Sequence, residues 1–161
     1  MEEIARLTQL FTKLGAKDPE GWARSQVDEG IPQLARFLFL RQAWKLVVDE
    51  DDEGWIAAAQ SAATAAARGE PGGALGPALG RLLAQGASKK DLTTVVRVMQ
   101  WRLLFSLCYL MEDPGLLDDE LGDIAWRLFQ VDEQDQPIAP IGGLHESVLE
   151  TEPSGREMRA R

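Results

Sequence analysis

The stretch from Lys89 to Glu112 constrains this fold more than any other part of the sequence. Large apolar residues fill most of its positions, and Pro114-Gly115 follows directly. Wound as a helix, these residues cover nearly the whole circumference, and a helix that is apolar all round is buried among other helices. Ser88 and Asp91 resemble a capping box at its start. We therefore expect a central apolar helix over about 89–112.

Helical spacing and start or stop residues recur along the rest of the chain. Asp18-Pro19 supplies an N-cap and a proline at the first helical position, while Gly15 ends the helix before it. Further helices are predicted over residues 2–15, 19–29, 32–48, 55–68, 75–84 and 117–129. The helix over 55–68 is so rich in alanine that it should pack close to a neighbouring backbone. The sequence thus predicts an all-α, irregular bundle of about six or seven helices.

The C-terminal part differs from the rest. Phe129–Ala139 has two short apolar runs around a polar turn, which predicts a hairpin-like pair of arms. We expect residues 130–161 to form an extended tail on the helices, with Val148 and Leu149 as its anchors. A length of 161 residues fits a single helical domain over 1–161.

Charge and apolar content limit the possible partners. With 26 acids against 17 bases, the net charge is −9, which repels phosphate backbones, so nucleic acid is not an expected partner. The longest apolar run, 103–111, is much shorter than the ~20 residues of a membrane span. The N-terminus carries no positive region of a signal peptide. We expect a soluble, cytoplasmic protein that has no membrane partner.

An unbroken acidic run, Asp49–Glu53, precedes the alanine-rich helix. With Gly54 and Ile56 it resembles an EF-hand calcium loop, which has oxygen ligands at positions 1, 3 and 5, glycine at 6 and an apolar residue at 8. Position 12 departs from the motif, because a neutral Gln stands where a bidentate Glu belongs. The candidate ligands of this weak calcium site are Asp49, Asp51, Glu53 and Gln60. The alternative is that the acids simply stabilise the start of the helix.

A second acidic cluster lies at 118–120, and Trp55 borders the first cluster. Complementary charge steers association with a basic protein, and an exposed aromatic residue suits an interface. The candidate partner-binding residues are Asp49, Asp51, Asp52, Glu53, Trp55, Asp118, Asp119 and Glu120.

The residue sets that most enzymes use are missing. His145 is the only histidine and has no second histidine for a zinc motif, and Cys108 lies in an apolar helix as a core residue would. We predict no catalytic residue and no cofactor. Arg97 and Arg102 keep an alternative open, because a charge buried on an apolar helix needs a partner or an anionic ligand.

The favoured interpretation is a non-enzymatic, acidic helical protein that binds a basic protein partner, as small immunity proteins do. One alternative is a helical enzyme or ligand-binding protein whose pocket uses Arg97, Arg102 and carboxylates. Another is a weak calcium-binding protein using the loop at 49–60. Self-association also remains open.

Overall fold

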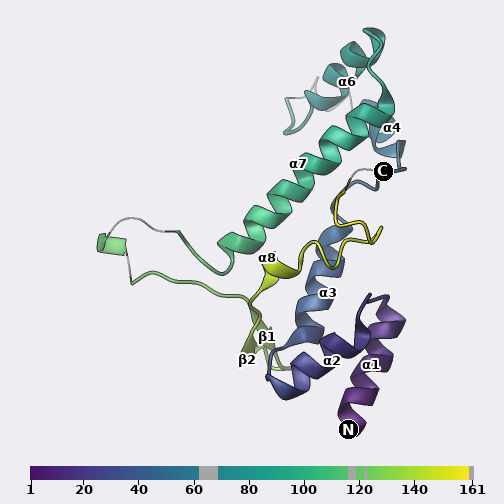
Figure 1. Ribbon diagram of the computed structural model, residues 1–161. Coiled ribbons are helices and arrows are strands. Elements are labelled where there is room, and N and C mark those ends of the chain that lie inside the picture. The colour runs from purple at the N-terminus through teal and green to yellow at the C-terminus, as the bar shows by residue number, and fades with distance from the viewer. Residues whose placement is uncertain (62–68, 116–118, 122, 160–161) are drawn as a thin grey trace. The chain divides into compact units, whose positions relative to one another are not determined.

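The structure is a computed structural model that describes residues 1–61, 69–115, 119–121 and 123–159 (Figure 1). These residues form seven α-helices, one 3-10 helix and a two-stranded sheet, so the fold is all-α, as the sequence predicts. The helices are α1 (Glu2–Leu14), α2 (Pro19–Asp28), α3 (Gln33–Trp44), α4 (Gly54–Ser61), α6 (Leu75–Ala84), α7 (Lys89–Leu110) and α8 (Leu144–Ser147). Within the described ranges, none of the helices has the length and apolar character to cross a bilayer.

The chain divides into two compact units. The first contains Met1–Lys45 and Leu103–Arg161, and the second contains Leu46–Arg102. Helix α7 contributes its first part to the second unit and its last part to the first. The organisation as a single domain over 1–161 stays a prediction.

An aromatic trio forms the core of the first unit. The rings of Phe11 on α1, Trp22 on α2 and Phe37 on α3 lie 5.3–5.8 Å apart between centroids. Leu7 and Ala23 are buried in the same cluster. Figure 1 shows α1 and α2 side by side, which brings the first two rings together. Tilted and edge-to-face ring pairs add to the free energy gained by burying these large side chains.

The turn between α1 and α2 follows the predicted local signals. Gly15 adopts a left-handed conformation (φ 85°), and its N–H donates to the carbonyl of Thr12. A residue with a Cβ is strained in this conformation, so glycine fits the position. The Asp18 carboxylate accepts from the N–H of Gly21 at 2.9 Å and caps α2. The predicted boundaries of both helices are confirmed to within a residue or two.

The C-terminal segment packs on α3. Leu144 and Val148 are fully buried, and the indole N–H of Trp44 donates to the carbonyl of Val148 at 2.9 Å. The short helix α8 stands where the sequence predicts only extended chain. The predicted hairpin is confirmed: β1 (Phe129–Val131) pairs antiparallel with β2 (Pro137–Pro140).

The predicted helix over 117–129 is wrong for the residues that the structure describes. Asp119–Leu121 forms one 3-10 turn, and residues 123–128 are not helical. Ile124, Trp126 and Leu128 recur at every second residue, so their spacing fits an extended chain as well as a helix. The indole N–H of Trp126 donates to the carbonyl of Leu110 at 2.7 Å, which ties this segment to the end of α7.

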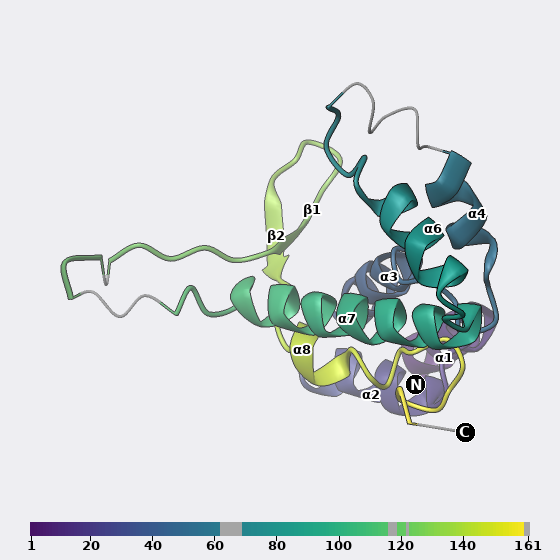
Figure 2. The same ribbon diagram turned by 90° about the horizontal axis from the view of Figure 1, so that it is seen from above.

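In the second unit, α4 and α6 lie side by side (Figure 2). A Cβ at Gly76 on α6 would lie 2.5 Å from the carbonyl oxygen of Ala59 on α4, so glycine permits this close approach. The close packing expected of the alanine-rich helix is therefore seen over 54–61. Its predicted continuation over 62–68 lies outside the described residues.

Helix α7 begins at the predicted residue and ends at Leu110, two residues before the predicted end. The expectation that it is buried all round is wrong for one face. Val95, Met99 and Leu103 are 59–60% exposed, whereas Thr93, Arg97 and Cys108 are buried. The buried residues recur at helical spacing, and Thr93 and Arg97 each have a hydrogen-bond partner. A helix face with polar side chains can be buried only where those side chains find hydrogen-bond partners. A hydropathy pattern does not reveal where such partners lie.

Candidate functional site

The acidic run at 49–53 has a local structural role. Asp52 accepts a hydrogen bond from the N–H of Gly54 at 2.7 Å, and Asp49 accepts from the N–H of Asp51 at 3.3 Å. The first of these bonds places a carboxylate at the start of α4, where it satisfies a free N–H and opposes the positive end of the helix dipole. Asp51 and Glu53 are exposed.

Over the described residues, no three side chains of His, Cys, Asp or Glu lie close enough together to hold a metal ion. Gln60, the proposed last ligand, lies on α4 and is exposed. Calcium binding at Asp49–Gln60 stays a prediction.

Trp55 is half-buried in the second unit. Its indole N–H donates to the hydroxyl of Thr93 on α7 at 2.9 Å. This bond satisfies the polar atom of the side chain, so Trp55 helps to hold α4 against α7 within the unit. Its part in partner binding stays a prediction.

The two arginines of α7 have different surroundings. Arg97 is buried and donates to the carbonyl of Val48 at 2.6 Å, while the N–H of Val48 donates to Gln100 at 2.7 Å. Two side chains of α7 therefore satisfy both backbone groups of a residue that lies outside regular secondary structure. Arg102 is exposed. The two cavities described below are lined by other residues.

The second acidic cluster is described only in part. Asp118 lies outside the described residues, and of Asp119 only the backbone is described, in the 3-10 turn. Glu120 is exposed in the same turn. The part of this cluster in partner binding stays a prediction.

A carboxylate–histidine pair that sequence reasoning missed lies at the start of α8. Glu112 accepts from the N–H of Gly143 at 2.8 Å and from the N–H of Leu144 at 2.5 Å, and it lies 3.4 Å from Nδ1 of His145. The ring of Tyr109 lies edge-on to the imidazole ring, with 5.1 Å between the two ring centroids. No spacing in the sequence links Glu112 to residues more than thirty positions away, so no local signal pointed to this pair.

The surroundings of Glu112 favour its charged form. Burial alone would raise the pKa of this carboxyl, but the N–H groups of Gly143 and Leu144 and the nearby His145 outweigh burial and hold the pKa below its usual range. Glu112 therefore acts as a charged cap for α8. Chemically, the pair can accept or hold a proton, yet no nucleophilic side chain is bonded to it among the described residues.

Arg36 on α3 lies next to the same loop. A Cβ at Gly143 would lie 2.6 Å from one of its terminal nitrogens, so only glycine allows the guanidinium this position. Burial lowers the pKa of Arg36, while the charges of Glu112, Glu146, Glu150 and Glu29 act in the opposite direction. Arg36 is thus a half-buried cation surrounded by carboxylates.

Cys108 is confirmed as a core residue. It is 1% exposed, and burial, followed by the negative charge of Glu112, raises the pKa of its thiol to about 11. A reactive cysteine needs exposure and a lowered pKa. Cys108 has neither property.

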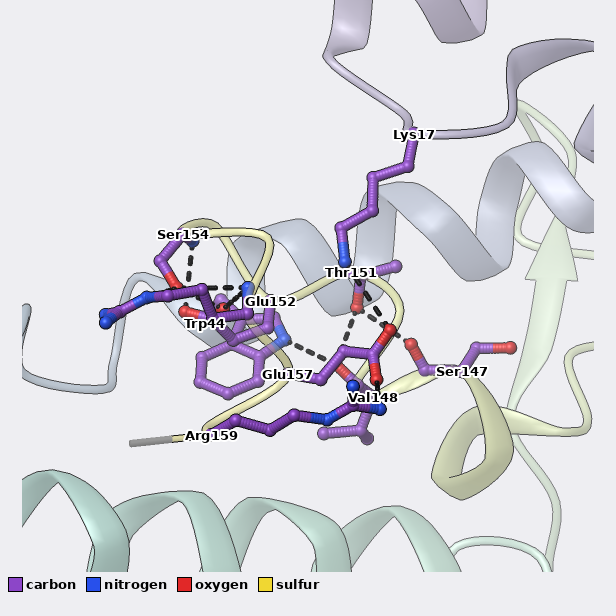
Figure 3. Close-up of polar contacts among 10 residues, drawn as sticks. Lys17, Trp44, Ser147, Val148, Thr151, Glu152, Ser154, Glu157 and Arg159 are labelled. Carbon is purple, nitrogen blue, oxygen red and sulfur yellow. Dashed lines mark hydrogen bonds and ion pairs between the residues drawn. The ribbon is translucent and has the colours of Figure 1, made fainter. Parts of the chain in front are cut away.

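Two cavities in the first unit lie beside α3 and the C-terminal segment. The larger, about 340 Å³, is lined by residues 14–17 of the α1–α2 turn, by Phe37 and Arg41 of α3, and by residues 150–155. Figure 3 shows Lys17 reaching from the turn toward the C-terminal segment, where its ammonium lies 3.7 Å from Glu157.

The smaller cavity, about 200 Å³, is polar. Gln33, Arg36, Ser147 and Glu150 are among its lining residues. Oε1 of Gln33 and Nε of Arg36 are buried and have no hydrogen-bond partner among the described residues. A polar cavity of this kind suits ordered water, which satisfies such groups.

The first unit also exposes a group of large apolar side chains, which we call the arm surface. Its members lie on the last part of α7, on the segment after the 3-10 turn and on the hairpin: Leu103, Leu107, Leu110, Ile124, Trp126, Phe129, Val131 and Ile138. The bond from Trp126 to Leu110 joins the first two parts. Residues 112–135, which include four members of the arm surface, carry nine acids and one base.

Comparison with models of protein families, with curated proteins and with solved structures finds no match to this chain.

Proposed function

We propose that this protein is a non-catalytic binding protein that engages a basic protein partner through the arm surface. The observation that carries the proposal is the exposure of eight large apolar side chains next to a nine-to-one excess of acids over bases. Large apolar side chains that gather on one part of a protein surface often mark an interaction site. Acids around such a patch favour a partner with basic residues at the rim of its own interface.

The surroundings of the reactive side chains also support binding over catalysis. Arg97 is bonded to a backbone carbonyl, Cys108 is buried with a raised pKa, and His145 contacts a carboxylate that caps a helix. Arg97 and His145 thus have partners within the fold, and Cys108 lies in the core. A neutralising role, of the kind that immunity proteins perform, is compatible with this arrangement.

The test is affinity capture from the native cell, using the full-length chain, with quantification by mass spectrometry. A Phe129→Ser/Val131→Ser variant removes two exposed side chains of the arm surface. A Val27→Ser/Leu38→Ser variant is the matched control, because these side chains are similarly exposed on α2 and α3. We expect the wild type and the control to retain the same basic protein, and the arm variant to lose it.

Salt dependence adds a second criterion. Because opposite charges attract less strongly as ionic strength rises, capture should fall as salt is added. The proposal is wrong if the arm variant captures the same protein as the wild type, or if that protein is acidic and its capture does not respond to salt.

The calcium alternative has its own measurement. A calorimetric titration should show calcium-dependent heat if Asp49, Asp51 and Glu53 hold the ion, and Asp51→Asn should abolish that heat. An absence of heat at millimolar calcium removes this alternative.

A further inference from the structure

We propose that the larger cavity of the first unit binds a small organic monocarboxylate with a short apolar body. The inference goes beyond the proposed function, because none of the lining residues belongs to the arm surface. A volume of about 340 Å³ falls within the range of roughly 300–1,000 Å³ in which proteins bind small ligands.

The cation that would hold the carboxylate is Arg41. Its guanidinium is exposed on α3 and makes no hydrogen bond or ion pair with any residue that the structure describes. A guanidinium offers two parallel N–H donors that match the two oxygens of a carboxylate. Arg41 is therefore a charged group at the cavity whose donors are unused within the described part of the chain.

The other charged side chains around the cavity have hydrogen-bond partners or neighbours of opposite charge. Glu152 is 2% exposed and accepts from the N–H and the hydroxyl of Ser154 at 3.0 and 2.5 Å and from the N–H of Arg156 at 3.1 Å. The Lys17 ammonium lies 3.7 Å from Glu157. Burial lowers the pKa of the neighbouring Arg36, whereas the negative charge of Glu150 acts to raise it and so favours the charged form.

The charged side chains of the lining favour a singly charged anion over a doubly charged one. The lining carries two bases, Lys17 and Arg41, and two acids, Glu150 and Glu152, so a ligand of low negative charge is repelled least. A single carboxylate adds one negative charge beside Arg41, whereas a phosphate dianion would add two near Glu150.

The apolar body of the ligand would lie against Phe37 and Leu14. Phe37 is one helical turn before Arg41, so both side chains project from the same face of α3. Pro153 adds an apolar group from the C-terminal segment. A carboxylate attached to a short hydrocarbon chain therefore meets a charged group at one end and apolar side chains at the other.

The test uses the full-length, ¹⁵N-labelled protein titrated with sodium hexanoate and followed by two-dimensional NMR. We expect saturable shifts of the amide signals of Lys17, Thr151 and Gly155. Arg41→Gln should weaken binding about tenfold, the effect of losing one strong charged contact. Arg81→Gln is the matched control, since Arg81 is an exposed helical arginine on α6, away from the cavity lining. It should bind as the wild type does.

Hexan-1-ol and inorganic phosphate define the ligand class. Both should bind far more weakly than hexanoate, because the first lacks the charge and the second lacks the apolar body. The proposal is overturned if hexanoate gives no saturable shifts, if Arg41→Gln binds it as tightly as the wild type, or if either comparison compound binds equally well. Because Arg41 is exposed, the variant should keep the wild-type pattern of signals elsewhere, which the same spectra show.

Discussion

Glu112→Gln tests the role of the carboxylate that caps α8. The charged side chain accepts from two backbone N–H groups, at 2.8 and 2.5 Å. Glutamine keeps one acceptor oxygen but turns an amide group toward the second N–H, so one bond to a charged acceptor is lost. Bonds to charged groups contribute about 1.5–3 kcal/mol, and caps typically about 1 kcal/mol. Allowing for partial solvent access, we expect a loss of about 1–2 kcal/mol at neutral pH.

The effect should depend on pH in a defined direction. The pKa of Glu112 in the folded state lies below its ordinary value of 4.5. Its charge therefore stabilises the fold above that value, and this contribution is lost as the pH falls from 4.5 through the folded-state pKa. The difference in stability between the wild type and Glu112→Gln should shrink over the same interval.

The assay is urea denaturation at neutral and at acidic pH, together with amide hydrogen exchange of Gly143 and Leu144. Glu146→Gln is the control, because Glu146 is an exposed carboxylate on the same short helix. The reasoning is refuted if Glu112→Gln is as stable as the control at neutral pH, or if its deficit does not diminish in acid.

Three further outcomes follow from the packing. Phe11→Ala should lower the free energy of unfolding by about 3–5 kcal/mol in urea denaturation, because it empties the centre of the aromatic core; a loss below about 1 kcal/mol would contradict that role. Arg97→Ala should cost about 1–3 kcal/mol in the same assay, since it removes the donor to the carbonyl of Val48, whereas Arg102→Ala should cost little. Cys108 should not react with a thiol reagent at pH 8 until the protein is unfolded, because its pKa is about 11 and it is buried; rapid labelling of the native protein would show that the thiol is accessible.

The predictions that are confirmed rest on signals within a few residues. Gly15 and Asp18 act on the backbone directly beside them, so the ends of α1 and α2 could be predicted from the sequence. The segment 123–128 lacked such signals. The spacing of its apolar residues fits both a helix and an extended chain. In the extended chain, Trp126 donates a hydrogen bond to the carbonyl of Leu110, sixteen residues earlier.

The candidate site was less predictable than the fold. Lys17, Arg41 and residues 150–155 meet at one cavity although they come from three distant parts of the sequence. None of them belongs to a recognisable motif. Among the acidic residues that did form a pattern, at 49–53, Asp52 bonds to the N–H of Gly54 at the start of a helix.

The sequence by itself determined the helical class, most helix boundaries, the hairpin and the acidic charge, because propensity, caps and turns act between near neighbours. Tertiary structure alone decided which face of α7 is buried, that Glu112 caps α8, and that Arg41 lies at a cavity. These features depend on which distant side chains meet. A buried polar group is tolerated only where a partner meets it, as Thr93 meets Trp55 and Arg97 meets Val48.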